Sequence, residues 1–312
     1  MVLYRSLDEV PRSRGRAIAL GTFDGVHLGH RQVIGAAVER AHEQELDSCV
    51  VTFDPHPATI LRPDNPPKLL STLDVKARRV AEIGVDEMVA IRFTRQFSQL
   101  SAEQFCEQVL GDVLGARYID VGENFHFGHG AVGDAAMLAS RSEFDTEVIG
   151  LVEHDGKPVS STRIRALVES GEVHAAADLL GAPFTFAGDV VSGDGRGRTL
   201  DMPTANITPA PQLVVPANGV YAAIAEVGGR RLAAAVNVGV RPTFEQDGQR
   251  LVEAHLIDFD GDIYGQTIQL GFLERLRDEL RFESAEELSS RMQEDVAQVR
   301  RIALSPQLAG AS

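Results

Sequence analysis

Short apolar runs alternate with amphipathic stretches over the first 182 residues of the chain. Each apolar run has the length of one buried strand, whereas the amphipathic stretches repeat their apolar positions every three or four residues, as a helix does. We expect strands at 16–20, 49–53, 88–93, 117–121 and 146–152, and helices near 29–44, 74–83 and 101–114. Such alternation is typical of a parallel sheet covered by helices. Polar motifs that follow the strands then meet at the carboxyl edge of the sheet, where open α/β folds bind ligands.

Polar residues predict where two helices begin and end. Ser101 and Gln104 have the spacing of a capping box, in which each side chain bonds the backbone N–H of the other residue. Thr162 is placed to cap a further helix over residues 163–170, because a threonine hydroxyl can accept a backbone N–H of the first turn. Gly171 follows as a residue that can take the left-handed conformation at a helix end.

The pattern changes after Gly181-Ala182-Pro183. The runs that follow are short, rich in Val, Ile and Ala, and separated by Gly, Pro, Asn and Asp, which is typical of an antiparallel barrel or sandwich. We expect these strands at 184–192, 219–227, 231–238, 251–259 and 267–273. From Ser284 the apolar residues again recur three or four apart, which predicts a closing helix. The sequence therefore predicts two domains with separate cores, residues 1–182 and 183–312.

Composition and charge narrow the classes of function. The 312 residues include 30 Lys and Arg against 45 Asp and Glu, so the formal net charge is −15. An acidic surface repels nucleic acid and anionic lipid, and we therefore expect neither a nucleic-acid nor a membrane partner. No apolar run approaches the ~18 residues of a membrane span, and the first residues lack the apolar core of a signal peptide, which favours a cytoplasmic protein. Cys49 and Cys106 are too few for a disulfide framework, fit no metal spacing and are expected in the core.

The most informative segment is GTFDGVHLGHR, residues 21–31, between an apolar strand and a helix. Such a turn directs backbone N–H groups and the positive end of a helix dipole at one point, which suits a phosphate. His27 and His30 lie three residues apart, so both can project from one face of the first helical turn. There they could stabilise charge on a phosphate under attack. The alternative is a pair of surface histidines on a capped helix.

A zinc site is the rival explanation of the histidines. His27, His30, His56, His126 and His129 could in principle cluster. No thiolate accompanies them, however, and the HExxH spacing is missing, which makes zinc the weaker interpretation.

A second set of phosphate-binding groups is SSTRIR, residues 160–165. Its hydroxyls can donate to phosphate oxygens, and its two arginines offer planar forks of donors. Taken alone, the segment is better explained as a Ser/Thr cap followed by a solvated basic turn. Together with the turn at residues 21–31, which we call the histidine turn, it favours a nucleotide site.

Three segments of the C-terminal half carry candidate chemistry for phosphorylating a hydroxyl. The loop GDGRGR, residues 193–198, can approach a phosphate closely. Pro203-Thr204-Ala205-Asn206 adds a hydroxyl and an amide oxygen, which are hard ligands suited to Mg²⁺. Glu253 lies in an apolar run, where its carboxylate either faces solvent or belongs to a site.

These segments resemble, in order, the motifs of the bacterial bifunctional riboflavin kinase/FAD synthetase family, whose N-terminal domain is an HxGH nucleotidyltransferase. The resemblance also includes residues 52–57, 122–128, 237–244 and 252–255, and so covers nearly the whole chain. It implies an N-terminal α/β Rossmann-like nucleotidyltransferase fold with a parallel sheet, followed by a riboflavin kinase-like antiparallel β-barrel with a C-terminal helix. It further implies that the barrel phosphorylates riboflavin to FMN and that the N-terminal domain adenylylates FMN to FAD, releasing pyrophosphate. ATP, riboflavin and FMN are then the substrates, and Mg²⁺ accompanies ATP in both steps.

The resemblance also implies roles for individual residues of the N-terminal domain. ATP would be bound by Gly21, Thr22, Phe23, Asp24, Gly25, His27, Gly29, His30, Ser160, Ser161, Thr162, Arg163 and Arg165. Of these, His27, His30 and Arg163 would be catalytic, whereas Asp24 would help to hold Mg²⁺. The flavin would contact His56, Asn124, Phe125 and Phe127. The family often has Asp-Phe-Arg where this chain has Asn124-Phe125-His126.

Roles in the barrel follow from the same resemblance. It assigns Pro203, Thr204 and Asn206 to ATP binding by the kinase. The glycine-rich loop, which can approach a phosphate closely, would add Gly193, Gly195, Gly197 and Arg198. Thr204 and Asn206 would also hold Mg²⁺. Glu253 would contact the flavin and act as the catalytic base for the ribityl 5′-hydroxyl. Arg277 would lie in a flavin-side loop and bind the flavin; a solvated helix arginine is the alternative.

One departure from the family concerns the kinase. Asp201-Met202 precedes Pro203, where the family usually has glycine and an aromatic residue. Glycine takes positive φ freely, and aspartate does so only at some cost. This departure is the one observation that supports the alternative of an FAD synthetase whose kinase domain has decayed. A further alternative, from another class of protein, is a flavin- or nucleotide-binding regulator without turnover.

Overall fold

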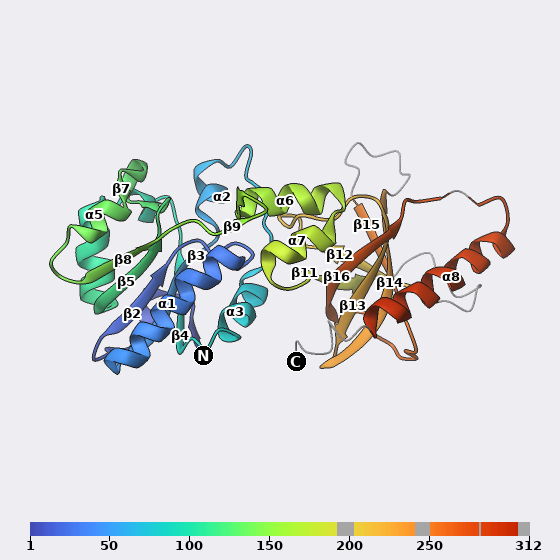
Figure 1. Cartoon of the computed structure of the whole chain (residues 1–312), viewed down its shortest axis with the longest axis horizontal. Coiled ribbons are helices and arrows are strands. Elements are labelled where there is room, and N and C mark those ends of the chain that lie inside the picture. Colours follow the sequence, from blue (N-terminus) through green and yellow to red (C-terminus); the bar gives the residue numbers. More distant parts are fainter. Residues whose placement is uncertain (192–202, 241–249, 281, 305–312) are drawn as a thin grey trace. The chain divides into compact units, whose positions relative to one another are not determined.

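The computed structural model describes residues 1–191, 203–240, 250–280 and 282–304 (Figure 1). The chain divides into two compact units. One comprises Met1–Pro67 and Leu73–Ser161, and the other comprises Lys68–Thr72 and Thr162–Ser312. Among the described residues, no helix is both long and apolar enough to cross a membrane.

A six-stranded parallel sheet forms the centre of the first unit (Figure 1). In spatial order its strands are β1 (Val2–Tyr4), β4 (Glu87–Arg92), β3 (Asp47–Asp54), β2 (Arg16–Leu20), β5 (Ala116–Gly122) and β8 (Asp145–Ile149). Every neighbouring pair is parallel, so the predicted α/β class is confirmed. The sequence does not predict β1, because its three residues at the sheet edge form no buried apolar run. β8 ends at Ile149 rather than at the predicted residue 152.

Helices cover both faces of this sheet. They are α1 (Leu28–Gln44), α2 (Pro57–Leu61), α3 (Leu73–Ala81), α4 (Ala102–Gln104), α5 (Ala135–Ala139), the π-helix η3 (Phe105–Val113) and the short 3-10 turns η1 (Leu7–Glu9), η2 (Phe97–Gln99) and η4 (His129–Ala131). Two short strand pairs join them: β6 (His126–Phe127) with β7 (Gly133–Asp134), and β9 (Glu153–His154) with β10 (Lys157–Pro158). α1 and α3 bury Ile34 and Val80 on one face. On the other face, η3 and α5 enclose a core that contains Cys49 and Cys106, as predicted.

The stretch predicted as a helix over 101–114 forms as α4 followed by η3. The Ser101 N–H donates to Gln104 Oε1 (2.9 Å) and the Gln104 N–H donates to Ser101 Oγ (3.1 Å), so the predicted capping box is confirmed. From Phe105 onward the backbone winds as a π-helix, whose apolar spacing over two turns is too close to that of an α-helix to be predicted.

The order of the strands reverses beside β2. β3 and β4 lie on one side of it, and β5 and β8 lie on the other. In open α/β sheets, ligands bind outside the carboxyl ends of the strands at such a switch point. The turn at residues 21–27 follows β2 and the segment 123–128 follows β5, so both motifs lie at this edge of the sheet.

A closed antiparallel barrel forms the core of the second unit (Figure 1). Around the barrel its strands are β11 (Phe184–Val191), β12 (Ala205–Pro209), β15 (Arg250–Leu256), β14 (Arg230–Val240), β13 (Gly219–Val227) and β16 (Thr267–Arg277). The structure thus decides for the barrel over the sandwich. The sequence does not predict β12, because Ile207 is its only strongly apolar residue. Residues 68–72 add to this unit, since the Leu69 N–H donates to the Gln212 carbonyl (2.7 Å).

Three helices accompany the barrel: α6 (Ser161–Ser170), α7 (Val173–Leu180) and α8 (Ala285–Ala303). The predicted start of α6 is wrong, because the backbone is already helical at Ser161 and Thr162 lies within the first turn rather than at the cap. Gly171 ends α6 with φ +86°, as predicted. The helix expected from Ser284 is confirmed as α8: Ser284 Oγ accepts the Glu287 N–H (3.1 Å), and Val299 is buried against β13 and β16.

Candidate functional sites

The turn between β2 and α1 is held in its shape by buried apolar side chains. Phe23 and Val26 have φ values of 48° and 47°, in the left-handed region that non-glycine residues rarely adopt. Both side chains are almost fully buried, which offsets the cost of that backbone. The Phe23 ring packs back onto Gly21, where an added Cβ would lie 3.0 Å from it. A larger residue at position 21 would have to displace the Phe23 ring by a few tenths of an ångström, so this close approach favours glycine.

His27 and His30 form a stacked pair at the start of α1. Their ring centroids lie 3.5 Å apart, and the Phe23 ring meets His30 edge-on at 5.3 Å. His27 caps the helix, because its Nδ1 accepts the His30 backbone N–H (3.3 Å). Nδ1 must then carry no proton, so the neutral ring carries its hydrogen on Nε2. His27 is only 6 % exposed, and the alternative of a surface histidine pair does not describe it.

Burial keeps both imidazoles neutral at pH 7. Desolvation lowers the pKa of His27 to about 4. The pKa of His30 is also well below its usual value, first because of burial and then because of the charges of His27 and Lys76. A neutral imidazole can donate one N–H to a phosphate oxygen without adding a buried positive charge.

Within the first unit, Ser161 of the second predicted phosphate motif contacts Asp24 of the first. The Asp24 side chain is 3 % exposed, and Ser161 Oγ donates to the Asp24 carbonyl (2.9 Å). Ser160 and Ser161 end the first unit, whereas Thr162, Arg163 and Arg165 belong to the second. Within that helix the Arg165 guanidinium donates to Thr162 Oγ1 (3.3 Å).

Lys76 is a residue of this site that sequence reasoning missed. Its Nζ donates to the Thr22 carbonyl (2.6 Å) and to Thr52 Oγ1 (3.2 Å), although the residue is only 6 % exposed. The signal was its place on the apolar stripe of the predicted helix, three residues after Leu73 and four before Val80. A lysine at such a position is either at the edge of the stripe or held by buried partners.

The predicted flavin-binding residues follow β3 and β5 at the same edge of the sheet. His56 caps α2, since its Nδ1 accepts the Ala58 N–H (3.1 Å). Asn124 is exposed, and Phe125 stacks on Phe127 with 5.8 Å between ring centroids. Phe127 is buried in the core behind Phe125, so Phe125 presents the more accessible ring.

Among the described residues, no three side chains of the types His, Cys, Asp or Glu lie close enough together to hold a metal ion. Mg²⁺ does not require three protein ligands, because it is usually held by one or two carboxylates together with substrate phosphates. The buried carboxylate of Asp24 fits this requirement.

Glu253 lies between two asparagines on the barrel wall. It stands directly opposite Asn206 of β12 and Asn237 of β14, and residues paired in this way point to the same side of a sheet. Its neighbours Val252 and Ala254 are fully buried on the other side, while Glu253 is half-buried. Asn237 was not among the predicted site residues; its pairing with Glu253 follows from strand register, which sequence spacing does not give.

The P-T-A-N segment, residues 203–206, leads into β12 next to Glu253. Thr204 is half-buried just before the strand, and the Pro203 carbonyl accepts from His255 Nδ1 (3.0 Å). The other kinase residues predicted to bind ATP lie outside the described residues, as does the Asp201-Met202 pair: Gly193, Gly195, Gly197 and Arg198.

Arg277 ends β16 in a buried ion pair. Its Nε and Nη2 atoms donate to the carboxylate of Asp295 on α8, the shortest distance being 2.7 Å. The Asp295 side chain is 4 % exposed. The expected place of Arg277 in a loop is therefore wrong, and so is the alternative of a solvated helix arginine. Arg277 is the last residue of strand β16, and its guanidinium is bonded to α8.

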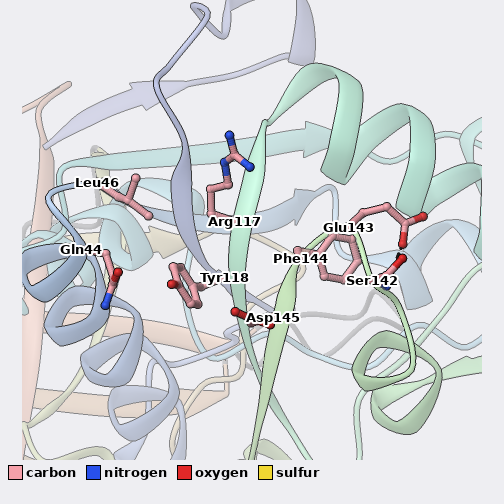
Figure 2. A pocket seen from close by; sticks show the side chains of 8 residues that line it. All are labelled: Gln44, Leu46, Arg117, Tyr118, Ser142, Glu143, Phe144 and Asp145. Atoms are coloured by element: carbon pink, nitrogen blue, oxygen red, sulfur yellow. Dashed lines mark hydrogen bonds between the residues drawn. The ribbon is translucent and has the colours of Figure 1, made fainter.

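A separate pocket of about 360 Å³ lies at the amino edge of the sheet in the first unit. Figure 2 shows it between the end of α1 at Gln44 and the first residues of β5 and β8, including Arg117, Tyr118 and Asp145. This is the edge opposite the histidine turn. None of the predicted site residues lines it.

The two units define a class of protein, a two-domain transferase with a nucleotidyltransferase-like α/β domain and a kinase-type barrel. The FAD synthetase family model matches residues 10–163, and the riboflavin kinase family model matches residues 180–303. The chain belongs to the bifunctional riboflavin kinase/FMN adenylyltransferase family. Its C-terminal domain phosphorylates riboflavin to FMN, and its N-terminal domain converts FMN to FAD.

Several relatives match along most of their length. Proteins named bifunctional riboflavin kinase/FMN adenylyltransferase are 38 % identical in Pseudomonas fluorescens, 37 % in Bacillus subtilis and 36 % in Escherichia coli K12. The matches cover 97 %, 89 % and 93 % of this chain and 98 %, 89 % and 93 % of the relatives. A crystal structure from Streptococcus pneumoniae, described as a macrolide-efflux protein, is 30 % identical with a TM-score of 0.84 and covers 96 % of this chain and 98 % of that one.

Proposed function

We propose that the turn at residues 21–30 is the site of adenylyl transfer. The observation that carries this proposal is the neutral, stacked pair His27 and His30 at the switch point of the sheet. In this reaction a phosphate oxygen of FMN attacks the α-phosphorus of ATP, and pyrophosphate leaves. The imidazole N–H groups and the backbone N–H groups at the start of α1 would bind the oxygens on which negative charge accumulates.

Residues 160–165 would supply the remaining phosphate contacts. Ser161 already touches the turn through the Asp24 carbonyl, which supports the assignment of Ser160 and Ser161. Arg163 and Arg165 lie two and four residues after Ser161 on α6, and their guanidinium groups would bind the leaving pyrophosphate. His56, Asn124, Phe125 and Phe127 would bind FMN, with Phe125 as the ring that meets the flavin.

We further propose that Glu253 is the general base of the kinase. It would accept the proton of the ribityl 5′-hydroxyl, whose oxygen attacks the γ-phosphorus of ATP. Thr204 and Asn206 would hold the Mg²⁺ that accompanies ATP, because their oxygens are ligands of the hard type that this ion prefers. When bound, Mg²⁺ would neutralise part of the charge on the transferred phosphoryl group. The register that sets Glu253 opposite Asn206 supports this division of roles.

Arg277 would bind the flavin of the kinase. Its guanidinium would be held in place for this contact by Asp295. The cytoplasm is the proposed location, in keeping with two cysteines that are both free thiols. The substrates proposed for the whole chain are ATP, riboflavin and FMN.

The test is to incubate the full-length protein with riboflavin, ATP and Mg²⁺ and to separate the flavins over time. The proposal expects FMN to appear first and FAD to follow. FAD formed from added FMN but not from riboflavin would show that the kinase domain has decayed. Flavin binding without either product would show a regulator instead of an enzyme.

A further inference from the structure

Lys76 is a buried ammonium group in the first unit that no proposed step uses. It lies on α3 among Val75, Ala77 and Val80, all of them buried. An ammonium group taken out of water costs free energy unless its hydrogens are bonded. In this protein two of them are, to the Thr22 carbonyl and to Thr52 Oγ1.

The three groups form a closed network around one carbonyl oxygen. Thr52 Oγ1 donates to the Thr22 carbonyl (2.9 Å), which also accepts from Lys76 Nζ (2.6 Å), while Lys76 and Thr52 are bonded to each other. Thr52 lies on β3 and is fully buried. Thr52 of strand β3 and Lys76 of helix α3 thus hold the carbonyl of Thr22, the second residue of the turn at residues 21–27.

These hydrogen bonds determine the orientation of the peptide group between Thr22 and Phe23. A trans peptide holds its C=O and N–H in opposite directions, so fixing the Thr22 carbonyl toward Lys76 points the Phe23 N–H away from it. Phe23, which has a left-handed backbone, follows directly, and Gly25 and Val26 also have positive φ values. A turn with such a backbone needs its surroundings to maintain it.

The charges of two carboxylates act on the ammonium group as well. Burial lowers the pKa of Lys76, while the charges of Asp24 and Asp54 act in the opposite sense. Asp24 is part of the turn, and Asp54 ends β3 just before His56. Lys76 therefore lies at the junction of the proposed ATP and FMN segments.

We propose that Lys76 is a positioning residue for adenylyl transfer, which holds the Thr22 carbonyl inward so that the Phe23 N–H faces the phosphates. The inference rests on the proposed assignment of residues 21–30 to this reaction. Lys76 contacts no substrate in this account. Its loss should misplace donors that act in the transition state, and such misplacement lowers kcat more than it weakens ATP binding.

The test compares Lys76→Met with Arg79→Met, which removes another buried cation from the same helix. FAD formation from FMN is measured as kcat and as KM for ATP, and FMN formation from riboflavin is measured on the same samples. We expect Lys76→Met to lower kcat by about 10- to 100-fold with a KM within about 3-fold of the wild type. Arg79→Met should retain the wild-type kcat.

A second pair keeps the test decisive if Lys76→Met does not fold. Thr52→Val removes the other donor to the Thr22 carbonyl, whereas Thr52→Ser retains it, so Val should lower kcat and Ser should restore it. Equal kcat values in Lys76→Met and Arg79→Met, or in both Thr52 variants, would overturn the inference. A rise in KM alone would also overturn it, because Lys76 would then bind ATP itself.

The proposed function is tested separately in the same assay with His30→Ala. If His30→Ala retains full FAD formation, the assignment of the turn is wrong whatever Lys76 does. If His30→Ala is impaired and Lys76→Met is not, only the positioning role fails.

Discussion

At the scale of single residues, burial decides the chemistry of the histidine turn. A pair of exposed imidazoles would titrate near neutral pH, whereas His27 and His30 are kept neutral by their surroundings. His27 has two further tasks, because it caps α1 and stacks on His30. These contacts fix which nitrogen carries the hydrogen and so which atom can donate to a phosphate.

This burial predicts how the stability of the first unit depends on pH. The pKa of His27 is about 4 in the folded protein and about 6.5 when the chain is unfolded, so the unfolded state binds more protons between these values. The contribution of His27 to the free energy of unfolding is therefore at its full value above about pH 6.5 and is lost as the pH falls toward 4. A shift of this size corresponds to on the order of 3 kcal/mol.

The variant His27→Asn tests the pH-dependent contribution of His27 to the free energy of unfolding. Asparagine retains a cap acceptor but does not titrate, so the free energy of unfolding should fall less steeply between pH 6.5 and 4 than in the wild type. Urea unfolding at several pH values measures both slopes. Equal slopes in the two proteins would show that His27 is not buried as described.

At the scale of elements, the Arg277–Asp295 ion pair anchors α8 to the end of β16. Removing one partner of a buried pair leaves the other charge without compensation, which typically costs about 3–5 kcal/mol. We expect Asp295→Asn to lower the free energy of opening of α8 by that amount, as measured by hydrogen exchange of its backbone amides.

The neighbouring residue supplies the control for this prediction. Glu294 pairs with Arg291 on the surface of the same helix, and its side chain is 62 % exposed. Exposed pairs contribute at most about 1 kcal/mol, so Glu294→Gln should leave exchange from α8 nearly unchanged. Similar exchange in the Asp295 and Glu294 variants would contradict the anchoring role.

The elements also show what sequence patterns can and cannot give. Buried strands such as β2 and β3, and helices with long apolar stripes such as α8, are predictable because periodicity reports burial. β12 is not, because Asn206 and Thr208 occupy positions that a strand on a barrel wall tolerates. The site is predictable where its residues are consecutive, as in residues 21–30. Lys76 joins that site through tertiary packing, and Asn237 is set beside Glu253 on the barrel by strand register. Local spacing encodes neither.

At the scale of the whole molecule, the two activities should reside in separable parts of the chain. α7 buries Val173, Leu179 and Leu180, and the chain at Gly171 runs against the Tyr221 hydroxyl of β13. These contacts of Gly171 and α7 are made within the second unit. A fragment that begins at residue 183 would lose them.

We expect fragments 162–312 and 183–312 both to make FMN and no FAD, with the longer fragment melting at the higher temperature. Its advantage is the apolar surface that α7 covers, which is worth roughly 25 cal/mol per Å². Thermal unfolding and flavin chromatography measure the two properties. FAD formation by either fragment, or failure of the longer one to fold, would contradict the proposed domains.

The central claim is that one chain carries two independent sites, with His30 serving adenylyl transfer and Glu253 serving phosphorylation. The most direct test measures both half-reactions on His30→Ala and on Glu253→Gln. We expect His30→Ala to lose about 10²–10³-fold in FAD formation with nearly unchanged FMN formation. Glu253→Gln should lose about 10²–10⁴-fold in FMN formation while it still converts added FMN to FAD. Equal loss of both activities in either variant, or FMN formation near the wild-type rate in Glu253→Gln, would contradict the account.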